Sequence, residues 1–244
     1  MLSVVIPCYN EAKRLGPMLD LVRAHAGLGW QWIFVDDGSR DATAAVVETL
    51  AADPALDVAL VRHPRNRGKG AAVRSGFLRA DRELVGYVDA DLAASPLEFQ
   101  PFLDGEKLRA GRELLLGIRL LTEEKRVERT FFRHLIGRIY QTYVSNLTGL
   151  TVYDTQCGFK LLATERARAI AEHLHCDGFA FDVELILLAR DRFGMAIREE
   201  PIHWREQGDS RVLPHHAARM FWEILRIHRR LKKRRAEEKN EETP

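Results

Sequence analysis

The sequence predicts an α/β protein whose mainly parallel central sheet is flanked by helices. Up to residue 120, short runs of β-branched and other apolar residues alternate with longer stretches of helical periodicity. Polar clusters follow several of these apolar runs. The 244 residues are 46% hydrophobic and 30% charged, which suits one globular domain with a sizeable core and a tail.

The predicted elements follow one another in a βαβα order. We expect strands at 2–7, 31–37, 56–63, 83–91 and 113–119, and helices at 17–26, 41–52, 70–81 and about 96–110. Continuous apolar strands are typical of a parallel sheet that is buried on both faces. Ligands of such sheets bind at the carboxyl ends of the strands, so we expect the site at that edge.

The alternation is lost after residue 120. A helix-like stretch at about 127–147 is followed by an extended segment at 151–162, with a tight turn at Gly158. An apolar stretch at 180–194 predicts a buried helix ending at Gly194, and 195–204 predicts a strand. Because the sequence contains no internal repeat or obvious linker, we expect one domain over residues 1–215.

The last part of the chain predicts an amphipathic basic helix at 216–235 and a polar, disordered tail at 236–244. In one interpretation, the apolar stripe of this helix packs onto the domain and its basic end is solvated. In the other, part of the helix, with Trp222 at its edge, rests on anionic lipid headgroups.

Bulk properties limit the partners and the compartment. A net charge of +2 and the absence of aromatic residues from "RRLKKRR" argue against nucleic-acid binding. The three cysteines lack a C-x-x-C spacing, which favours a reducing compartment. No secretory signal and no apolar run as long as a membrane span is recognisable. We therefore expect a cytoplasmic protein with peripheral contact to the cytoplasmic face of a membrane.

Four polar clusters fall at the expected strand ends, at 7–11, 36–39, 66–70 and 89–91. Each alone could be an ordinary turn. Four clusters at one edge indicate a shared crevice.

The cluster at 89–91 places two carboxylates two residues apart, where a strand ends. Asp89 and Asp91 repel each other unless a cation lies between them, and their hard oxygen atoms suit Mg²⁺ or Mn²⁺. The alternative is a strand that ends in an acidic turn.

Five motifs together resemble glycosyltransferase family 2, whose members have a GT-A fold. In order, they are "PCYNE", "VDDGS", "NRGKGAAVRSGF", "DADL" and "DTQCGFK". The last motif, with "FAFDVELILLA" and "EEPIHWREQGDSRV" after it, resembles the branch that moves glucose or a related sugar onto a polyprenyl phosphate such as dolichyl phosphate. The resemblance covers roughly residues 2–230.

This resemblance implies an inverting, metal-dependent glycosyltransferase with a nucleotide-sugar donor, favoured to be UDP-glucose, and a polyprenyl phosphate acceptor. It implies that Asp89 and Asp91 bind Mg²⁺ or Mn²⁺, whose charge stabilises the departing diphosphate. The residues implied to bind the donor are Pro7, Tyr9, Glu11, Asp36, Lys69, Asp89, Ala90 and Asp91, with Asp36 at the base or ribose.

Two alternative activities differ from this one in the substrate or in the reaction. A family 2 transferase using GDP-mannose is disfavoured because Ala93 stands where the mannosyl branch has an amide side chain. A nucleotidyltransferase that makes nucleotide sugars would have a glycine-rich loop near its amino terminus, which "IPCYNEAKRLG" matches poorly.

The acceptor phosphate is already anionic near neutral pH, so it needs cations more than a general base. Candidate cations are Arg119, Arg129 and Arg133, with Arg211 a weaker one. Asp154 is expected near the sugar, where it either holds hydroxyl groups or supports an arginine.

The remaining polar residues of these motifs have less specific roles. Gln156, Cys157 and Gly158 are expected to shape the sugar pocket, with Cys157 an inert buried thiol. Asp182 and Glu184 lie in an apolar helix and could be structural ion-pair partners or sugar ligands.

Overall fold

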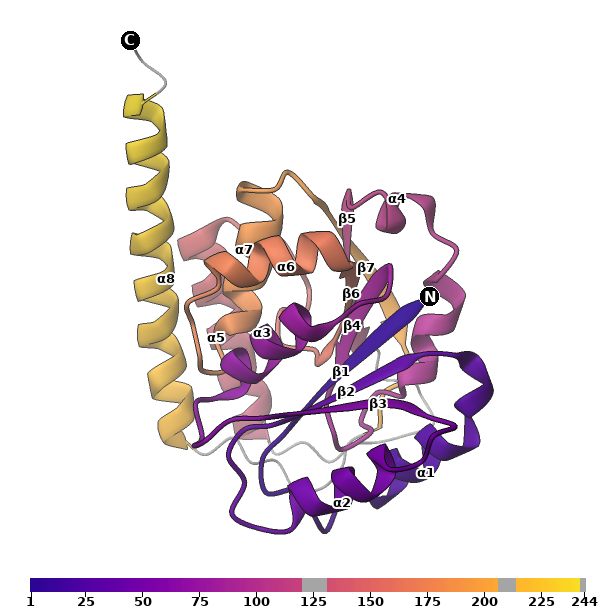
Figure 1. The fold of residues 1–244 in the computed structure, drawn as a ribbon. Coiled ribbons are helices and arrows are strands. Elements are labelled where there is room, and N and C mark those ends of the chain that lie inside the picture. Colours follow the sequence, from indigo (N-terminus) through magenta and orange to yellow (C-terminus); the bar gives the residue numbers. More distant parts are fainter. Residues whose placement is uncertain (120–130, 206–213, 242–244) are drawn as a thin grey trace.

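The computed structural model describes residues 1–119, 131–205 and 214–241 (Figure 1). Its centre is one seven-stranded sheet in the order β3-β2-β1-β4-β6-β5-β7. The strands are β1 (Leu2–Cys8), β2 (Gln31–Asp36), β3 (Asp57–Arg62), β4 (Leu84–Val88), β5 (Glu113–Arg119), β6 (Phe159–Ala163) and β7 (Ala196–Ile202). Strands β1 to β4 are parallel, and β6 runs antiparallel to both β4 and β5. The predicted mainly parallel sheet is confirmed.

Helices cover both faces of the sheet (Figure 1). The helices are α1 (Gly16–Ala24), α2 (Thr43–Ala51), α3 (Lys69–Arg79), α4 (Glu106–Arg109), α5 (Phe131–Thr148), α6 (Thr164–His173), α7 (Phe181–Asp191) and α8 (Pro214–Glu241). One core lies between the sheet and α3, α6 and α7, with α5 and α8 outside them. A second core lies under α1, α2 and α4. Successive strand residues such as Val4 and Val5 enter opposite cores, which explains the continuous apolar strands.

Two predicted elements are wrong in detail. The helix expected at 96–110 is instead a 3₁₀ helix, Pro96–Phe102, followed by the four residues of α4. Pro101 lies inside the first of these, where it has no N–H to continue an α-helical ladder. Within the segment expected to be extended at 151–162, the strand begins only at Phe159.

The carboxyl-terminal helix is longer than predicted. Helix α8 runs from Pro214 to Glu241, whereas the sequence predicted a helix over 216–235 and disorder after it. The residues after 235 include alanine, glutamate and lysine, which favour a helix even though they are polar. Their polarity therefore did not indicate disorder up to Glu241.

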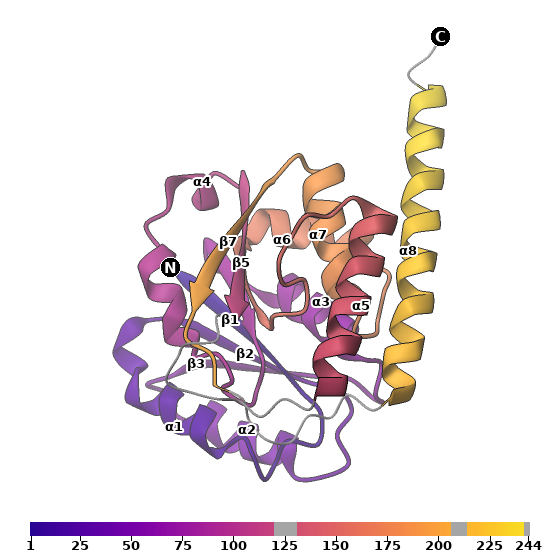
Figure 2. The same ribbon diagram turned by 180° about the vertical axis from the view of Figure 1, so that it is seen from behind.

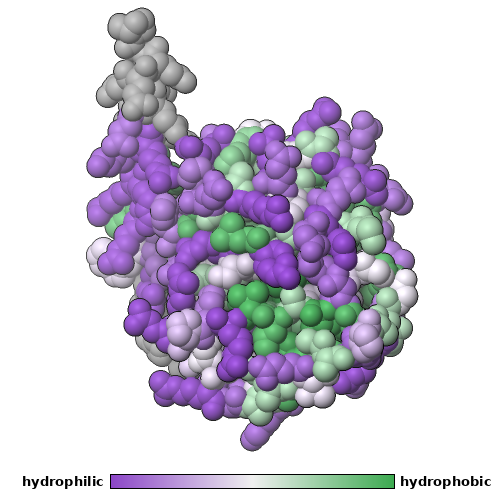
Figure 3. Space-filling model, viewed as in Figure 1, coloured by the Kyte–Doolittle hydropathy of each residue, from purple (hydrophilic) through white to green (hydrophobic). Residues whose placement is uncertain are grey.

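Helix α8 packs along α5 and α7, and Figure 2 shows α5 and α8 side by side. Its buried stripe contains Met220, Ile224 and Ile227, and the ring of Phe221 lies 5.6 Å from that of Tyr140. The packing interpretation therefore accounts for the apolar stripe. In Figure 3 the visible side of α8 is predominantly hydrophilic. Among the described helices, none is long and apolar enough to cross a bilayer.

Candidate active site

The turns after β1, β2 and β3 form an open pocket of about 610 Å³ at the carboxyl edge of the sheet. Its wall includes Tyr9 after β1, and Asp36 at the end of β2. The other lining residues are Gly38, Ser39, Arg40, Arg62, His63, Pro64, Arg65 and Asn66. Three of the four polar clusters thus contribute to one cavity, because parallel strands end at the same edge.

The turn after β1 is fixed by the turn after β2. The backbone N–H of Asn10 donates to Ser39 Oγ at 2.9 Å, and that of Glu11 donates to Thr43 Oγ1 at 2.8 Å. The Glu11 carboxylate is buried and receives two hydrogen bonds from Arg14, at 2.8 and 2.9 Å. Pro7 lies within β1. Pro7 and Glu11 do not line this pocket, and their contact with the donor stays a prediction.

The adjacent residues Asp36 and Asp37 differ in their surroundings. Asp36 accepts the N–H of Ser39 at 3.0 Å and lines the pocket. Asp37 is 3% exposed and accepts hydrogen bonds from His63 and from the backbone of Arg67 and Gly68. The sequence did not identify Asp37 or His63 as site residues. The alternation of side chains along a strand could have separated the two aspartates.

Lys69 begins α3 and directs its ammonium at the acidic pair. Its Nζ lies 2.6 Å from Asp89 Oδ1. The preceding Gly68 has φ +114°, and a Cβ there would lie 2.2 Å from the carbonyl oxygen of Asp177. The Gly70 N–H donates to the same oxygen at 2.9 Å. Glycine is therefore required where the start of α3 meets the Asp177 loop.

The structure brings Asp89 and Asp91 together. Burial and the negative charge of Asp89 raise the pKa of Asp91, so a cation between them would stabilise both charged forms. Gly158 approaches closely enough that a Cβ there would lie 2.1 Å from Asp89 Oδ2. The side chain of Ala90 is buried in the core beneath.

Arg119 and Asp154 form a two-pronged ion pair beside this carboxylate pair. The Nε–Oδ2 and Nη2–Oδ1 distances are 2.6 and 2.9 Å. The guanidinium also lies over the ring of Trp204, 5.5 Å from its centroid. Two roles were considered for Asp154, and this ion pair matches the one in which it supports an arginine.

Asp182 and Glu184 both have structural partners. Lys160 is fully buried, and its Nζ lies 2.6 Å from Asp182 Oδ1. Glu184 is also fully buried and accepts the backbone N–H of Cys176 at 2.6 Å and a guanidinium N–H of Arg230, in α8, at 2.9 Å. The ion-pair interpretation therefore holds for both acids.

Comparison with known proteins assigns the family. The family model of glycosyl transferase family 2 matches residues 3–168. The chain belongs to this family. It is 33% identical to a dolichyl-phosphate beta-glucosyltransferase of Trichomonas vaginalis over 239 residues, covering 92% of this chain and 70% of that protein. It is 33% identical to the Homo sapiens protein of the same name over 249 residues, covering 93% and 72%.

Solved structures place the glycosyltransferase in the GT-A fold, as predicted. The glucosyl-3-phosphoglycerate synthase of Mycobacterium tuberculosis in complex with UDP superposes with a TM-score of 0.67 at 20% identity, covering 93% of this chain and 80% of that one. The same synthase with Mn²⁺, UDP and glucosyl-3-phosphoglycerate gives 0.66 at 19%, covering 93% and 78%.

The predicted phosphate contacts Arg129 and Arg211 lie outside the described residues. Arg133 belongs to α5, but its side chain is outside the described part.

Cys157 is buried, and burial raises the pKa of its thiol to about 12, as expected for an inert cysteine. Among the described atoms, Nε2 of the neighbouring Gln156 is buried without a hydrogen-bond partner.

Proposed function

We propose that this glycosyltransferase moves glucose from UDP-glucose to a polyprenyl phosphate such as dolichyl phosphate, with inversion at the anomeric carbon. The observation that carries the proposal is the pocket with Tyr9 and Asp36 at the same sheet edge as Lys69, Asp89 and Asp91. We expect a nucleoside to lie in this pocket and its diphosphate at the charged end. The names of the relatives, dolichyl-phosphate beta-glucosyltransferases, support the sugar and the acceptor.

Asp89 and Asp91 would hold Mg²⁺ or Mn²⁺. The donor set fits a hard cation because it offers two carboxylates in one turn, and burial together with the negative charge of Asp89 raises the pKa of Asp91. No group of three or more His, Cys, Asp or Glu side chains with metal-binding geometry occurs in the described ranges, so donor phosphates and waters would complete the coordination. When bound, the cation would stabilise the charge of the departing diphosphate.

Lys69 would contribute to the same end of the donor. Its ammonium is 2.6 Å from Asp89 and is held at the first residue of α3 by the glycines on either side. From there it can contact a diphosphate oxygen that sits over the acidic pair.

The acceptor would react without a dedicated base. An anionic phosphate oxygen attacks the anomeric carbon, and the bond from that carbon to the diphosphate oxygen breaks with its electrons on the leaving group. Arg119, held by Asp154 and Trp204, would orient the acceptor phosphate. Arg129 and Arg133 remain proposed as further phosphate contacts.

We also propose peripheral contact with the cytoplasmic face of a membrane through the exposed side of α8. Trp222, Arg226, Arg229 and Lys233 are exposed and recur at helical spacing, so they form one stripe. Because the apolar side of α8 packs on the domain, contact would be electrostatic, with Trp222 at the interface.

A donor screen tests the activity. The purified protein is incubated with a short polyprenyl phosphate, Mn²⁺ and either UDP-glucose, UDP-galactose or GDP-mannose, and lipid-linked sugar is extracted and measured. We expect a glucosyl lipid from UDP-glucose. Preferential use of GDP-mannose would contradict the donor, and the absence of a lipid product from all three would contradict the acceptor.

A further inference from the structure

The buried residue Asp37 connects the ends of two other strands. The backbone N–H of Asp37 donates to the carbonyl of Cys8, at the end of β1, at 2.8 Å. The carboxylate oxygen Oδ1 of Asp37 lies 2.7 Å from His63 Nδ1, in the turn after β3. The backbone N–H groups of Arg67 and Gly68 donate to the same carboxylate, the latter at 2.7 Å. Asp37 therefore fastens the β3–α3 turn at both of its ends.

The orientation of the His63 ring follows from its partners. The Asp37 carboxylate can only accept hydrogen bonds, so Nδ1 carries a proton. On the other side of the ring, Nε2 lies 2.9 Å from Ser75 Oγ, in α3. His63 is 8% exposed, and its backbone N–H donates to the carbonyl of Asp36 at 2.9 Å. Ring and backbone are thus both fixed.

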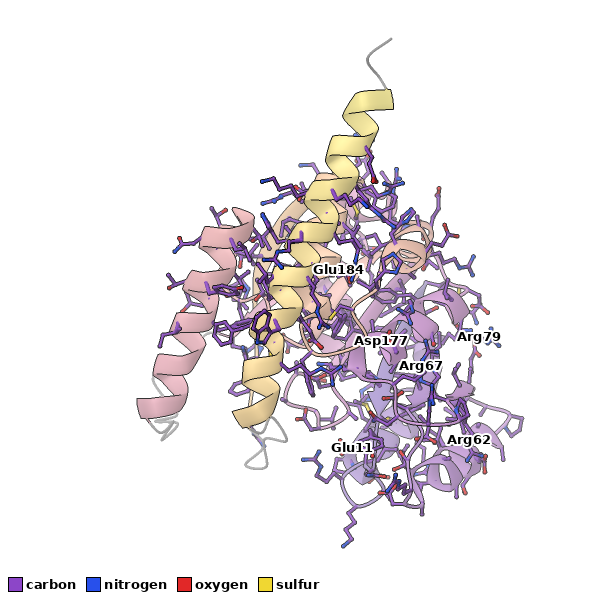
Figure 4. The ribbon with its side chains drawn as sticks, turned by 90° about the vertical axis from the view of Figure 1, so that its left-hand side faces the viewer. Glu11, Arg62, Arg67, Arg79, Asp177 and Glu184 are labelled. Carbon is purple, nitrogen blue, oxygen red and sulfur yellow. The ribbon has the colours of Figure 1, made fainter. Side chains whose placement is uncertain are left out.

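The fastened turn supplies both ends of the donor site. Residues 62–66 form one wall of the nucleotide pocket, and Lys69 follows Gly68 directly. The turn enters α3 against Asp177, whose carbonyl oxygen accepts the Gly70 N–H at 2.9 Å; Figure 4 labels Asp177 and Arg67 in this region. A shift of the turn away from Asp37 would move the pocket wall and the Lys69 ammonium together.

We infer that the Asp37–His63 pair is a positioning device for the donor, which holds the β3–α3 turn in the shape that binds the nucleotide and its diphosphate. The inference rests on the proposed function for the identity of the donor. Neither side chain needs to touch the reacting atoms. Loss of the pair would let the turn adopt other shapes, and donor affinity falls in proportion to the fraction that keeps the binding shape.

Two substitutions of His63 separate this role from general packing. In His63→Asn, the amide nitrogen takes the place of Nδ1 and can still donate to Asp37. In His63→Gln, the amide nitrogen reaches the place of Nε2 and the bond to Asp37 is lost. Both variants are polar amides at one position, so they share the loss of the imidazole ring.

The first measurement is calorimetric titration with UDP and Mn²⁺. We expect the dissociation constant of His63→Gln to rise about tenfold and that of His63→Asn to stay within about threefold of the parent, since hydrogen bonds to a charged acceptor are worth this much or more. The donor KM of His63→Gln should rise by more than its acceptor KM, because the turn contacts the donor alone.

The second measurement is hydrogen exchange at the backbone amides of Arg67 and Gly68, without nucleotide. Both amides should exchange about tenfold faster in His63→Gln than in His63→Asn. Equal exchange in the two variants would overturn the inference whatever the donor is. A parent protein that fails to bind UDP would overturn the proposed donor. UDP binding by the parent with equal affinities for the two variants would overturn the positioning role alone.

Discussion

Replacing Gly158 by alanine tests whether the position of the Asp89 carboxylate controls transfer. The added Cβ would lie 2.1 Å from Asp89 Oδ2, whereas contacts under 3.0 Å essentially never occur, so the oxygen has to move by about 1 Å. The backbone of Gly158 has no positive φ that would oppose alanine. The carboxylate, at the end of a flexible side chain, therefore moves rather than the fold.

The expected effect is large on turnover and modest on stability. A misplacement of about 1 Å in a catalytic constellation costs about 10²-fold in rate, whereas an added methyl group in a packed site costs about 1–3 kcal/mol of unfolding free energy. Turnover is measured as glucosyl lipid formed at several Mn²⁺ concentrations, and stability by urea denaturation. Gly158→Ala should need more Mn²⁺ for half-maximal rate.

Gly16→Ala is the matched control. At Gly16 nothing lies within 4 Å of the added Cβ, so the same substitution should leave turnover and the Mn²⁺ requirement unchanged. If Gly158→Ala retained the turnover and the Mn²⁺ requirement of the parent, the close contact with Asp89 would have no role in catalysis and the reasoning would be refuted.

Three further predictions concern the metal pair, the buried ion pair and α8. Asp91→Asn should keep the fold and lose most of the transfer, because an anionic ligand is lost at nearly constant volume; near-normal turnover at limiting Mn²⁺ would contradict the metal role. Lys160→Met should lower the free energy of unfolding by about 3–5 kcal/mol, because it leaves the Asp182 carboxylate buried without a cation and removes the donor to the carbonyls of Thr155 and Cys157. Urea denaturation should show that adding Asp182→Leu recovers part of this loss, and no recovery would mean that the charge is not its cause. Replacing Arg226 and Arg229 by glutamine should weaken binding to anionic vesicles, measured by sedimentation, about thirtyfold at low salt, without changing UDP binding, and unchanged sedimentation would exclude this stripe as the contact.

Local patterns in the sequence determined the elements and the edge where the site lies. Buried strands such as β1 and β2 are apolar runs of characteristic length, and their polar ends mark one side of any parallel sheet. The spacing of Asp89 and Asp91 places them in one turn whatever surrounds it. The periodic apolar stripe of α8 predicted its packed side. The extension of α8 to Glu241 was not predicted, because the residues after 235 are polar although several of them favour a helix.

The tertiary structure alone decided which side chains meet. Asp37 and His63 are 26 residues apart, and Arg119 and Asp154 are 35 apart. The contact that requires Gly158 joins β6 to the end of β4 through antiparallel pairing, which the βαβα pattern did not predict. Hydrophobic periodicity indicates which face of an element is buried. It does not indicate the partner of that face, because the hydrophobic effect is non-directional. Hydrogen bonds and ion pairs need distances of about 3 Å between specific atoms, and those distances are set only when strand order and register bring distant segments together.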